Sequence, residues 1–323
     1  MKKLLSITMA IILVAISLFA LSSCGKKTEG AVNVTTLNGT TGFGMAPLMK
    51  EHSLGNTENQ YSFTVETDPA KVTAGLMNGT IDIAALPTNA AANVYNKTNG
   101  GVQIIAINTL GVLYVVTNGV EINSISDLEG KTIYCPAQNP LFITKYIIEK
   151  SGLSDKVTID STSYSAPDAL REAVKAGSVD IAVLPEPMVT IAQSGNSNLK
   201  VSLDLTSEWN KVSGGKQLVQ GCVVVRTEFA NEFPGSVDSF LEEYEASIKS
   251  LNEDPAAGAA AIKEFGVFAN DKVAEKAIPK CNIAFLSGKD MKEAMENFLD
   301  AMYKTAPASI GNALPSEDFY YGS

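Results

Sequence analysis

A short stretch of this chain occurs twice, and the repetition restricts the folds that the chain can adopt. GTIDIAALPTNAA begins at Gly79, and the near copy GSVDIAVLPEPMV begins at Gly177, 98 residues later. The prolines, glycines and aspartates in and before the two stretches keep this spacing: Pro69 and Pro167, Gly79 and Gly177, Asp82 and Asp180, Pro87 and Pro185. A constant spacing without gaps indicates two copies of one strand–helix unit, which either duplication or convergence of short units can produce.

Each copy contains the residues that end a helix, form a buried strand and then end the strand. Glycine ends a helix in the left-handed conformation, where a Cβ atom is penalised. The aliphatic run is typical of a strand buried on both faces, and proline ends such a strand because it has no N–H for the ladder. We interpret Asp82 and Asp180 as structural carboxylates that accept hydrogen bonds from nearby backbone N–H groups.

The segments around each copy alternate between strand and helix patterns. In the first half we predict strands at 31–37, 61–67 and 80–86, helices at 46–55 and 68–79, and a glycine-rich loop at 38–47. In the second half we predict strands at 131–136, 156–162 and 178–184 and helices at 141–152 and 168–177. A further strand is predicted within 218–229, and only helical patterns follow Pro234. The fold class is therefore α/β, with two βαβ-based domains and a helical C-terminal third.

The first 24 residues have the layout of a secretory signal followed by a lipidation site. Two lysines precede an apolar run, and the run ends in LSSC at Leu21 to Cys24, which resembles the bacterial lipobox. We therefore predict a signal peptide at 1–23, a lipid on Cys24 and a polar spacer at 24–30. A transmembrane anchor is the alternative, because the run is nearly long enough to span a bilayer.

Charge and cysteine content argue against a nucleic-acid-binding surface and against a cysteine metal site. The formal net charge is −10 and the only arginines are Arg171 and Arg226, so the clustered basic residues of a nucleic-acid-binding protein are missing. Cys135, Cys222 and Cys281 have no metal-binding spacing. We interpret them as buried thiols, and one disulfide among them is the alternative.

The lipobox, the paired units and the helical last third together resemble the substrate-binding lipoproteins of ABC importers, which have the type II periplasmic-binding fold. The resemblance is to the nitrate, sulfonate and taurine branch, which also includes binders of thiamine precursors. It rests on LMNGTIDIAALPTNAA, SISDLEGKTIY, AGSVDIAVLPEP and PGSVDSFLEEYEASIKSLNEDPAAGAAAI. It implies a monomer, anchored by lipid on the outer face of the cell membrane, that passes a small molecule to a permease and its ATPase.

The resemblance also implies that the second domain is inserted into the first. Domain 1 would comprise 31–114 and 224–323, domain 2 would comprise 115–223, and the two crossings would form a hinge. Ligands of open α/β sheets lie at the carboxyl ends of the strands, which here are 39–44, 86–89, 136–140 and 184–187.

These strand ends, with one residue of the returning strand, supply the candidate ligand-binding residues. The glycine-rich loop offers backbone N–H groups and hydroxyls, and the other positions offer neutral amides, a hydroxyl and one carboxylate. The candidates are Thr40, Thr41, Gly42, Phe43, Thr88, Asn89, Gln138, Asn139, Glu186 and Gln220. Thr and Asn in such loops equally favour helix caps and turns, and the alternative for Glu186 is a solvated loop charge.

The loops also restrict the charge of the ligand. They contain no Lys or Arg, but they contain Glu186, which would repel an anion by several kcal/mol in a desolvated site. We therefore expect a neutral or cationic small molecule that contains nitrogen, such as an aromatic heterocycle.

No catalytic, metal or cofactor site is predicted. The single histidine, His52, has no Ser, Cys or carboxylate at a spacing that indicates a triad, and we interpret Trp209 as a packing residue. Two alternative functions stay open. Enzymes of the same fold act in thiamine-pyrimidine or menaquinone synthesis, although the export signal argues against them, and a ligand-sensing lipoprotein would need no permease.

Overall fold

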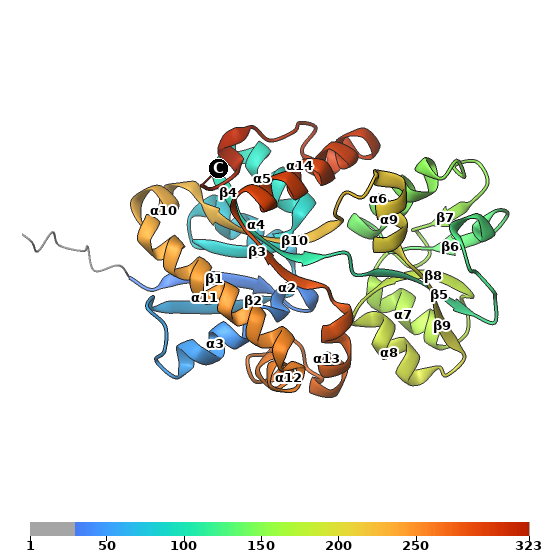
Figure 1. The fold of residues 1–323 in the computed structure, drawn as a ribbon, viewed down its shortest axis with the longest axis horizontal. Coiled ribbons are helices and arrows are strands. Elements are labelled where there is room, and N and C mark those ends of the chain that lie inside the picture. The colour runs from blue at the N-terminus through green and yellow to red at the C-terminus, as the bar shows by residue number, and fades with distance from the viewer. Residues whose placement is uncertain (1–29, 323) are drawn as a thin grey trace, which may run out of the picture.

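The computed structural model describes residues 30–322, so the predicted signal peptide, Cys24 and most of the predicted spacer lie outside the described residues. The described chain forms two β-sheets side by side, each flanked by helices (Figure 1). We call the six-stranded sheet with its helices the first lobe, and the five-stranded sheet with its helices the second lobe. No helix within residues 30–322 is long and apolar enough to cross a membrane.

The first lobe combines residues from both ends of the chain. Its sheet has the order β11-β4-β10-β3-β1-β2, in which β1 is parallel to β2 and β3, whereas β10 is antiparallel to β3 and β4. The strands are β1 (Val32–Leu37), β2 (Tyr61–Glu66), β3 (Ile83–Pro87), β4 (Val102–Leu110), β10 (Val219–Arg226) and β11 (Ile283–Leu286). The helices are α2 (Thr40–Phe43), α3 (Ala46–Ser53), α4 (Pro69–Asn78), α5 (Thr88–Thr98), α10 (Thr227–Glu232), α11 (Pro234–Glu253), α12 (Pro255–Glu264), α13 (Asp271–Ala277) and α14 (Gly288–Thr305), with 3₁₀ turns η2 (Ile278–Lys280), η3 (Pro307–Ile310) and η4 (Glu317–Phe319).

The second lobe is formed by the middle of the chain. Its sheet has the order β7-β6-β8-β5-β9, in which β6 is parallel to β7 and β8, and β5 is antiparallel to β8 and β9. The strands are β5 (Leu113–Asn118), β6 (Thr132–Tyr134), β7 (Thr158–Asp160), β8 (Ile181–Pro185) and β9 (Leu199–Asp204). The helices are α6 (Asn139–Lys150), α7 (Pro167–Lys175), α8 (Met188–Gly195) and α9 (Leu205–Ser213), with the 3₁₀ turn η1 (Ile125–Leu128).

The repeated sequence forms equivalent units in the two lobes. β3 and β8 occupy equivalent stretches of the two copies, and each follows a helix that ends before a glycine in the left-handed conformation, with φ of 78° at Gly79 and 72° at Gly177. Asp82 confirms the structural interpretation, because its carboxylate accepts the backbone N–H of Asn33 at 3.0 Å and pairs with Arg226 at 2.9 Å. The predicted α/β fold class is confirmed.

Two predictions about the chain differ from the structure. The prediction of helices alone after Pro234 is wrong, because β11 pairs with β4 at the edge of the first sheet; this strand has only four residues, too few to show a period. The glycine-rich loop contains a short helix, α2. The chain passes from the first sheet to the second between Leu110 and Leu113 and returns between Asp204 and Val219.

The strand directions bring one set of strand ends to the boundary between the lobes. β4 ends at Leu110 and β5 begins at Leu113, so the end of one sheet lies beside the start of the other. β1 and β3 run in the direction of β4, and β6 and β8 run toward the start of β5. The carboxyl ends of β1, β3, β6 and β8 therefore all face the opposite lobe.

An apolar cluster also joins the lobes. Trp209 of α9 lies between Tyr146 of α6 and Phe298 of α14, with ring centroids 4.5 and 5.9 Å away. Because α14 also packs on β4 and α5, this helix connects the first lobe with the second. Trp209 is 1 % exposed, which confirms its interpretation as a packing residue.

Candidate functional site

The candidate residues from the sequence lie along the boundary between the lobes, each at or just after a strand end. From the first lobe come Thr40, Thr41, Gly42 and Phe43 after β1, Thr88 and Asn89 after β3, and Gln220 at the start of β10; from the second lobe come Gln138 and Asn139 after β6 and Glu186 after β8. The fold therefore brings segments more than 140 residues apart in the sequence to one boundary.

Two of these candidates contact each other directly across the boundary. The Thr40 hydroxyl donates a hydrogen bond of 2.7 Å to the backbone carbonyl of Glu186. In the opposite direction, the Tyr114 hydroxyl of the second lobe donates to the backbone carbonyl of Lys280 at 2.9 Å. The Lys280 ammonium lies 3.9 Å from the Glu186 carboxylate, and α8 also packs on α13, as Figure 1 shows. We call Thr40, Tyr114, Glu186 and Lys280 the lobe contact.

The Glu186 carboxylate forms its hydrogen bonds within its own lobe. It is 2 % exposed, and its two oxygens accept hydrogen bonds of 3.1 Å from the backbone N–H and the hydroxyl of Thr190. This places the carboxylate over the first turn of α8, where a negative charge is favourable. Burial raises the pKa of Glu186, and the Thr190 hydrogen bonds and Lys280 oppose that rise. Its carboxylate therefore caps the first turn of α8 and also takes part in the lobe contact.

Two buried amides at the boundary have oxygens without a partner. Asn89 and Asn139 are each 7 % exposed and lie in the first turns of α5 and α6. Within residues 30–322, the Oδ1 atom of each amide is buried and accepts no hydrogen bond. A buried polar atom without a partner costs about 1–3 kcal/mol. Each oxygen is therefore suited to accept a hydrogen bond from a bound molecule.

Gln138 precedes Asn139 in a strained backbone conformation. Its φ of 66° and ψ of −136° lie in a region that residues other than glycine rarely adopt. Such strain costs of order 1–3 kcal/mol and concentrates at functional sites. The Gln138 side chain is exposed, so it is accessible to a molecule at the boundary.

The other candidates shape the boundary through the backbone or the core. Thr88 donates its hydroxyl to the carbonyl of Val219, and Gln220 accepts the backbone N–H of Val112 at 2.7 Å, so both hold the crossing strands in place. The carbonyl of Thr41 accepts a hydrogen bond from Asn108.

Gly42 and Phe43 are buried below the boundary. A Cβ atom on Gly42 would lie 2.1 Å from the carbonyl oxygen of Leu37. The Phe43 ring is fully buried in the core of the first lobe, edge to face with Phe268 at 6.0 Å. The short helix α2 thus directs this ring into the core of the first lobe.

Residues that the sequence analysis did not select complete the boundary. Asn108 is 1 % exposed and donates its amide N–H groups to the Thr41 carbonyl and the Tyr244 hydroxyl, both at 3.0 Å. Asn282 donates to the carbonyl of Gly111 in the first crossing. An Asn in the apolar run VQIIAINTL was a usable signal for Asn108, whereas Tyr114 and Lys280 had no local signal.

The cysteines that the structure describes are free thiols inside the protein. Cys135, Cys222 and Cys281 are free and buried, which confirms the interpretation as thiols and excludes a disulfide among them in this structure. Burial raises the pKa of all three thiols. Within residues 30–322, His, Cys, Asp and Glu side chains form no group of three that could hold a metal ion.

Comparisons with known proteins extend this description. The family model of the phosphonate ABC transporter periplasmic substrate-binding protein matches residues 51–264. An ABC transporter structure from Parabacteroides distasonis is 24% identical and has a TM-score of 0.77, covering 90% of this chain and 99% of its own. The periplasmic aliphatic sulphonate binding protein SsuA from Escherichia coli is 13% identical, with a TM-score of 0.72 and coverage of 88% and 91%.

A Candida albicans protein that exhibits the generic periplasmic binding protein fold is 12% identical, with a TM-score of 0.57 and coverage of 90% of this chain and 93% of its own. A search of curated proteins gave no significant match. The likeness to these solved structures establishes the periplasmic-binding fold.

Proposed function

Because this chain belongs to the family of phosphonate-type ABC transporter periplasmic substrate-binding proteins, we propose that it captures a small nitrogen-containing molecule between its two lobes and delivers it to a permease. The family places the chain outside the cytoplasm and makes it a binding protein. The lipid anchor at Cys24, the monomeric state and the identity of the ligand belong to the proposal.

We further propose that the two lobes are domains that open and close about the two crossings. The support is that, within residues 30–322, the chain crosses between the lobes twice, and that the lobe contact uses side-chain hydrogen bonds that separation would replace with water. Ligand binding would shift the population from open to closed molecules, and the permease would distinguish the closed form from the open form.

The observation that carries the ligand proposal is the pair of buried amide oxygens on Asn89 and Asn139. Two acceptors without partners favour a molecule that donates N–H or O–H hydrogen bonds. Glu186 contributes less directly than its sequence position indicated, because its carboxylate bonds to Thr190. The preference for a neutral or cationic molecule therefore rests on the amide oxygens and on the scarcity of cationic side chains among the candidate residues.

An oxyanion is the second candidate. The SsuA relative is named for aliphatic sulphonates, and the matched family is named for phosphonates. In this chain, α5 and α6 both begin at the boundary without a side-chain cap, so their first N–H groups are available to an anion.

Calorimetry with probes of different charge tests the two candidates. We expect the purified protein to bind an aminopyrimidine more tightly than methylphosphonate or ethanesulfonate. The variants Asn89→Leu and Asn139→Leu should each weaken that binding about fivefold, the loss of one neutral hydrogen bond. The variant Asn89→Asp keeps the acceptor and should retain binding. Tight binding of a sulfonate or phosphonate that Asn89→Asp weakens more than tenfold would establish the oxyanion instead.

A further inference from the structure

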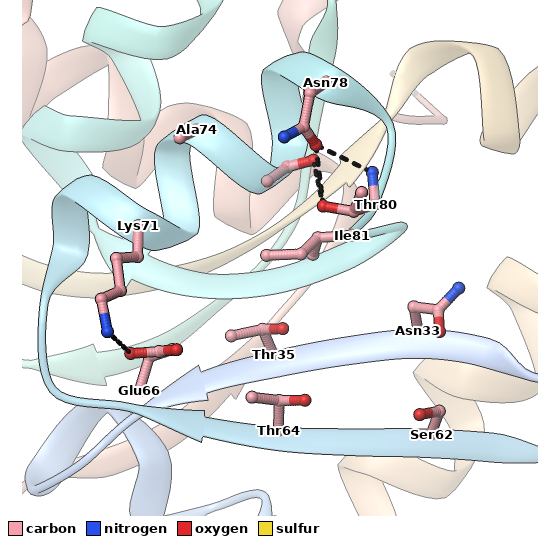
Figure 2. Close-up of a pocket in the computed structure, with 11 residues that line it drawn as sticks. Asn33, Thr35, Ser62, Thr64, Glu66, Lys71, Ala74, Asn78, Thr80 and Ile81 are labelled. Carbon is pink, nitrogen blue, oxygen red and sulfur yellow. Dashed lines mark hydrogen bonds and ion pairs between the residues drawn. The ribbon is translucent and has the colours of Figure 1, made fainter.

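A groove on the outside of the first lobe lies apart from the boundary between the lobes. It has a volume of about 380 Å³ and lies between α4 and the neighbouring strands β1 and β2 (Figure 2). None of its lining residues belongs to the lobe contact or to the candidate ligand-binding residues. Any molecule bound in this groove would therefore occupy a second site.

The groove exists because α4 covers only part of the sheet. β2 is the edge strand, and its alternate residues Tyr61, Phe63 and Val65 pack into the core on the other face. The residues between them therefore point toward the α4 side, where α4 packs through Val72 and Leu76. The face of the edge strand beside α4 is left open.

The open face presents paired hydroxyl and amide side chains. In the register of β1 with β2, Asn33 lies opposite Ser62 and Thr35 lies opposite Thr64. Asn78 and Thr80 extend the same chemistry along the other wall, and Figure 2 shows Thr35 and Thr64 together on the strands below α4. Neutral hydrogen-bonding side chains thus line this face of the groove.

Thr35 is the most deeply buried of the hydroxyl residues that line this groove. Its side chain lines the groove and the residue is only 4 % exposed. Asn33 bonds to Asp82, and Thr80 bonds to Asn78. Within residues 30–322, the Thr35 hydroxyl takes part in none of these hydrogen bonds. A nearly buried hydroxyl that lines the groove can form a hydrogen bond with a polar molecule that enters it.

The charges in the groove cancel each other. Lys71 and Glu66 form an ion pair of 3.4 Å at one end, so neither is left to select a charged ligand. Ala74, Gly75 and Ile81 form a small apolar ledge beside the hydroxyls. A ligand with hydroxyl groups and C–H faces, and without charge, matches this lining.

We propose that this groove is a second binding site, for a saccharide or another uncharged polyol. A volume of 380 Å³ lies in the lower part of the range for small-molecule sites. An extended peptide is a poorer match, because it would use the free backbone edge of β2 rather than the hydroxyls on its face.

Saturation-transfer NMR with maltose and N-acetylglucosamine tests the proposal on the purified protein. We expect transfer to the sugar, and a titration should show that Thr35→Val weakens binding about fivefold, the loss of one neutral hydrogen bond in an isosteric change. Ala74→Leu adds an apolar side chain on the exposed side of α4, so it should abolish transfer by filling the groove without disturbing the core.

Two control variants show whether the sugar binds in the groove or elsewhere on the protein. Thr73→Val removes a hydroxyl from α4 outside the groove and should leave sugar binding unchanged. Asn89→Leu alters the boundary between the lobes and should also leave it unchanged, so this result is independent of the proposed transport ligand. No transfer at tens of millimolar sugar, or transfer that survives Ala74→Leu and falls with Asn89→Leu, would overturn the proposal.

Discussion

Removal of one hydroxyl from the lobe contact should open the protein in the absence of ligand. In this structure Thr40 donates a 2.7 Å hydrogen bond to the Glu186 carbonyl, and Thr40→Val is nearly isosteric. A neutral hydrogen bond contributes about 1 kcal/mol, so the ratio of closed to open molecules should fall about fivefold. The carbonyl left without its partner in the closed form makes this a lower estimate.

The ion pair of the lobe contact, between Lys280 and Glu186, should contribute less to closure than the Thr40 hydrogen bond. The Lys280 ammonium is 3.9 Å from the Glu186 carboxylate, but its side chain is 48% exposed, so water screens the pair. Discounted for that exposure, the pair contributes about 0.5 kcal/mol, and Lys280→Met should lower the closed-to-open ratio about twofold. Both residues contact Glu186, so the double variant also measures their coupling.

Single-molecule energy transfer between the lobes measures these ratios directly. Leu54 in the first lobe and Val201 in the second are exposed, so Leu54→Cys and Val201→Cys supply dye positions in a Cys24→Ser background, whereas Cys135, Cys222 and Cys281 are buried. Thr227→Val is the matched control, because its hydroxyl donates a 2.6 Å bond to Gly100 within the first lobe. An unchanged distance distribution in Thr40→Val, or an equal shift in Thr227→Val, would refute the reasoning.

Three further predictions concern stability and processing. Because burial raises the pKa of Glu186, the folded state favours the protonated form of this residue. The free energy of unfolding of the native protein should therefore fall, relative to that of Glu186→Gln, as the pH rises from about 4.5. Urea titrations at several pH values would detect the fall, and parallel curves for the two proteins would contradict it. Gly42→Ala should destabilise the protein by roughly 1–3 kcal/mol in urea unfolding, because its Cβ atom meets the Leu37 carbonyl, and a neutral result would mean that α2 shifts freely. Cys24→Ser should abolish incorporation of a fatty-acid label, and equal labelling of both forms would exclude lipidation at this residue.

Much of the fold was predictable because its signals are local. The glycines at 79 and 177, the following aliphatic runs and the closing prolines act within a few residues of themselves, and they predicted the two equivalent strands β3 and β8. The alternation of strands and helices then predicted parallel units, whose carboxyl ends supply the boundary. The short strand β11 was missed because four residues give no reliable period, and it is held in the sheet by pairing with β4.

The arrangement of the boundary itself was decided by tertiary structure. The sequence placed Thr40 and Glu186 at strand ends, but only the assembled lobes join them by a hydrogen bond between residues 146 positions apart. The sequence predicts a ligand-facing charge at Glu186, yet its burial, its bonds to Thr190 and its proximity to Lys280 depend on how α8 packs against α13. The sequence alone therefore determined which segments end at the boundary, because turns and caps are set by neighbours in the chain. The tertiary structure decided which of them face a ligand, a helix end or the opposite lobe, because that depends on contacts between distant segments.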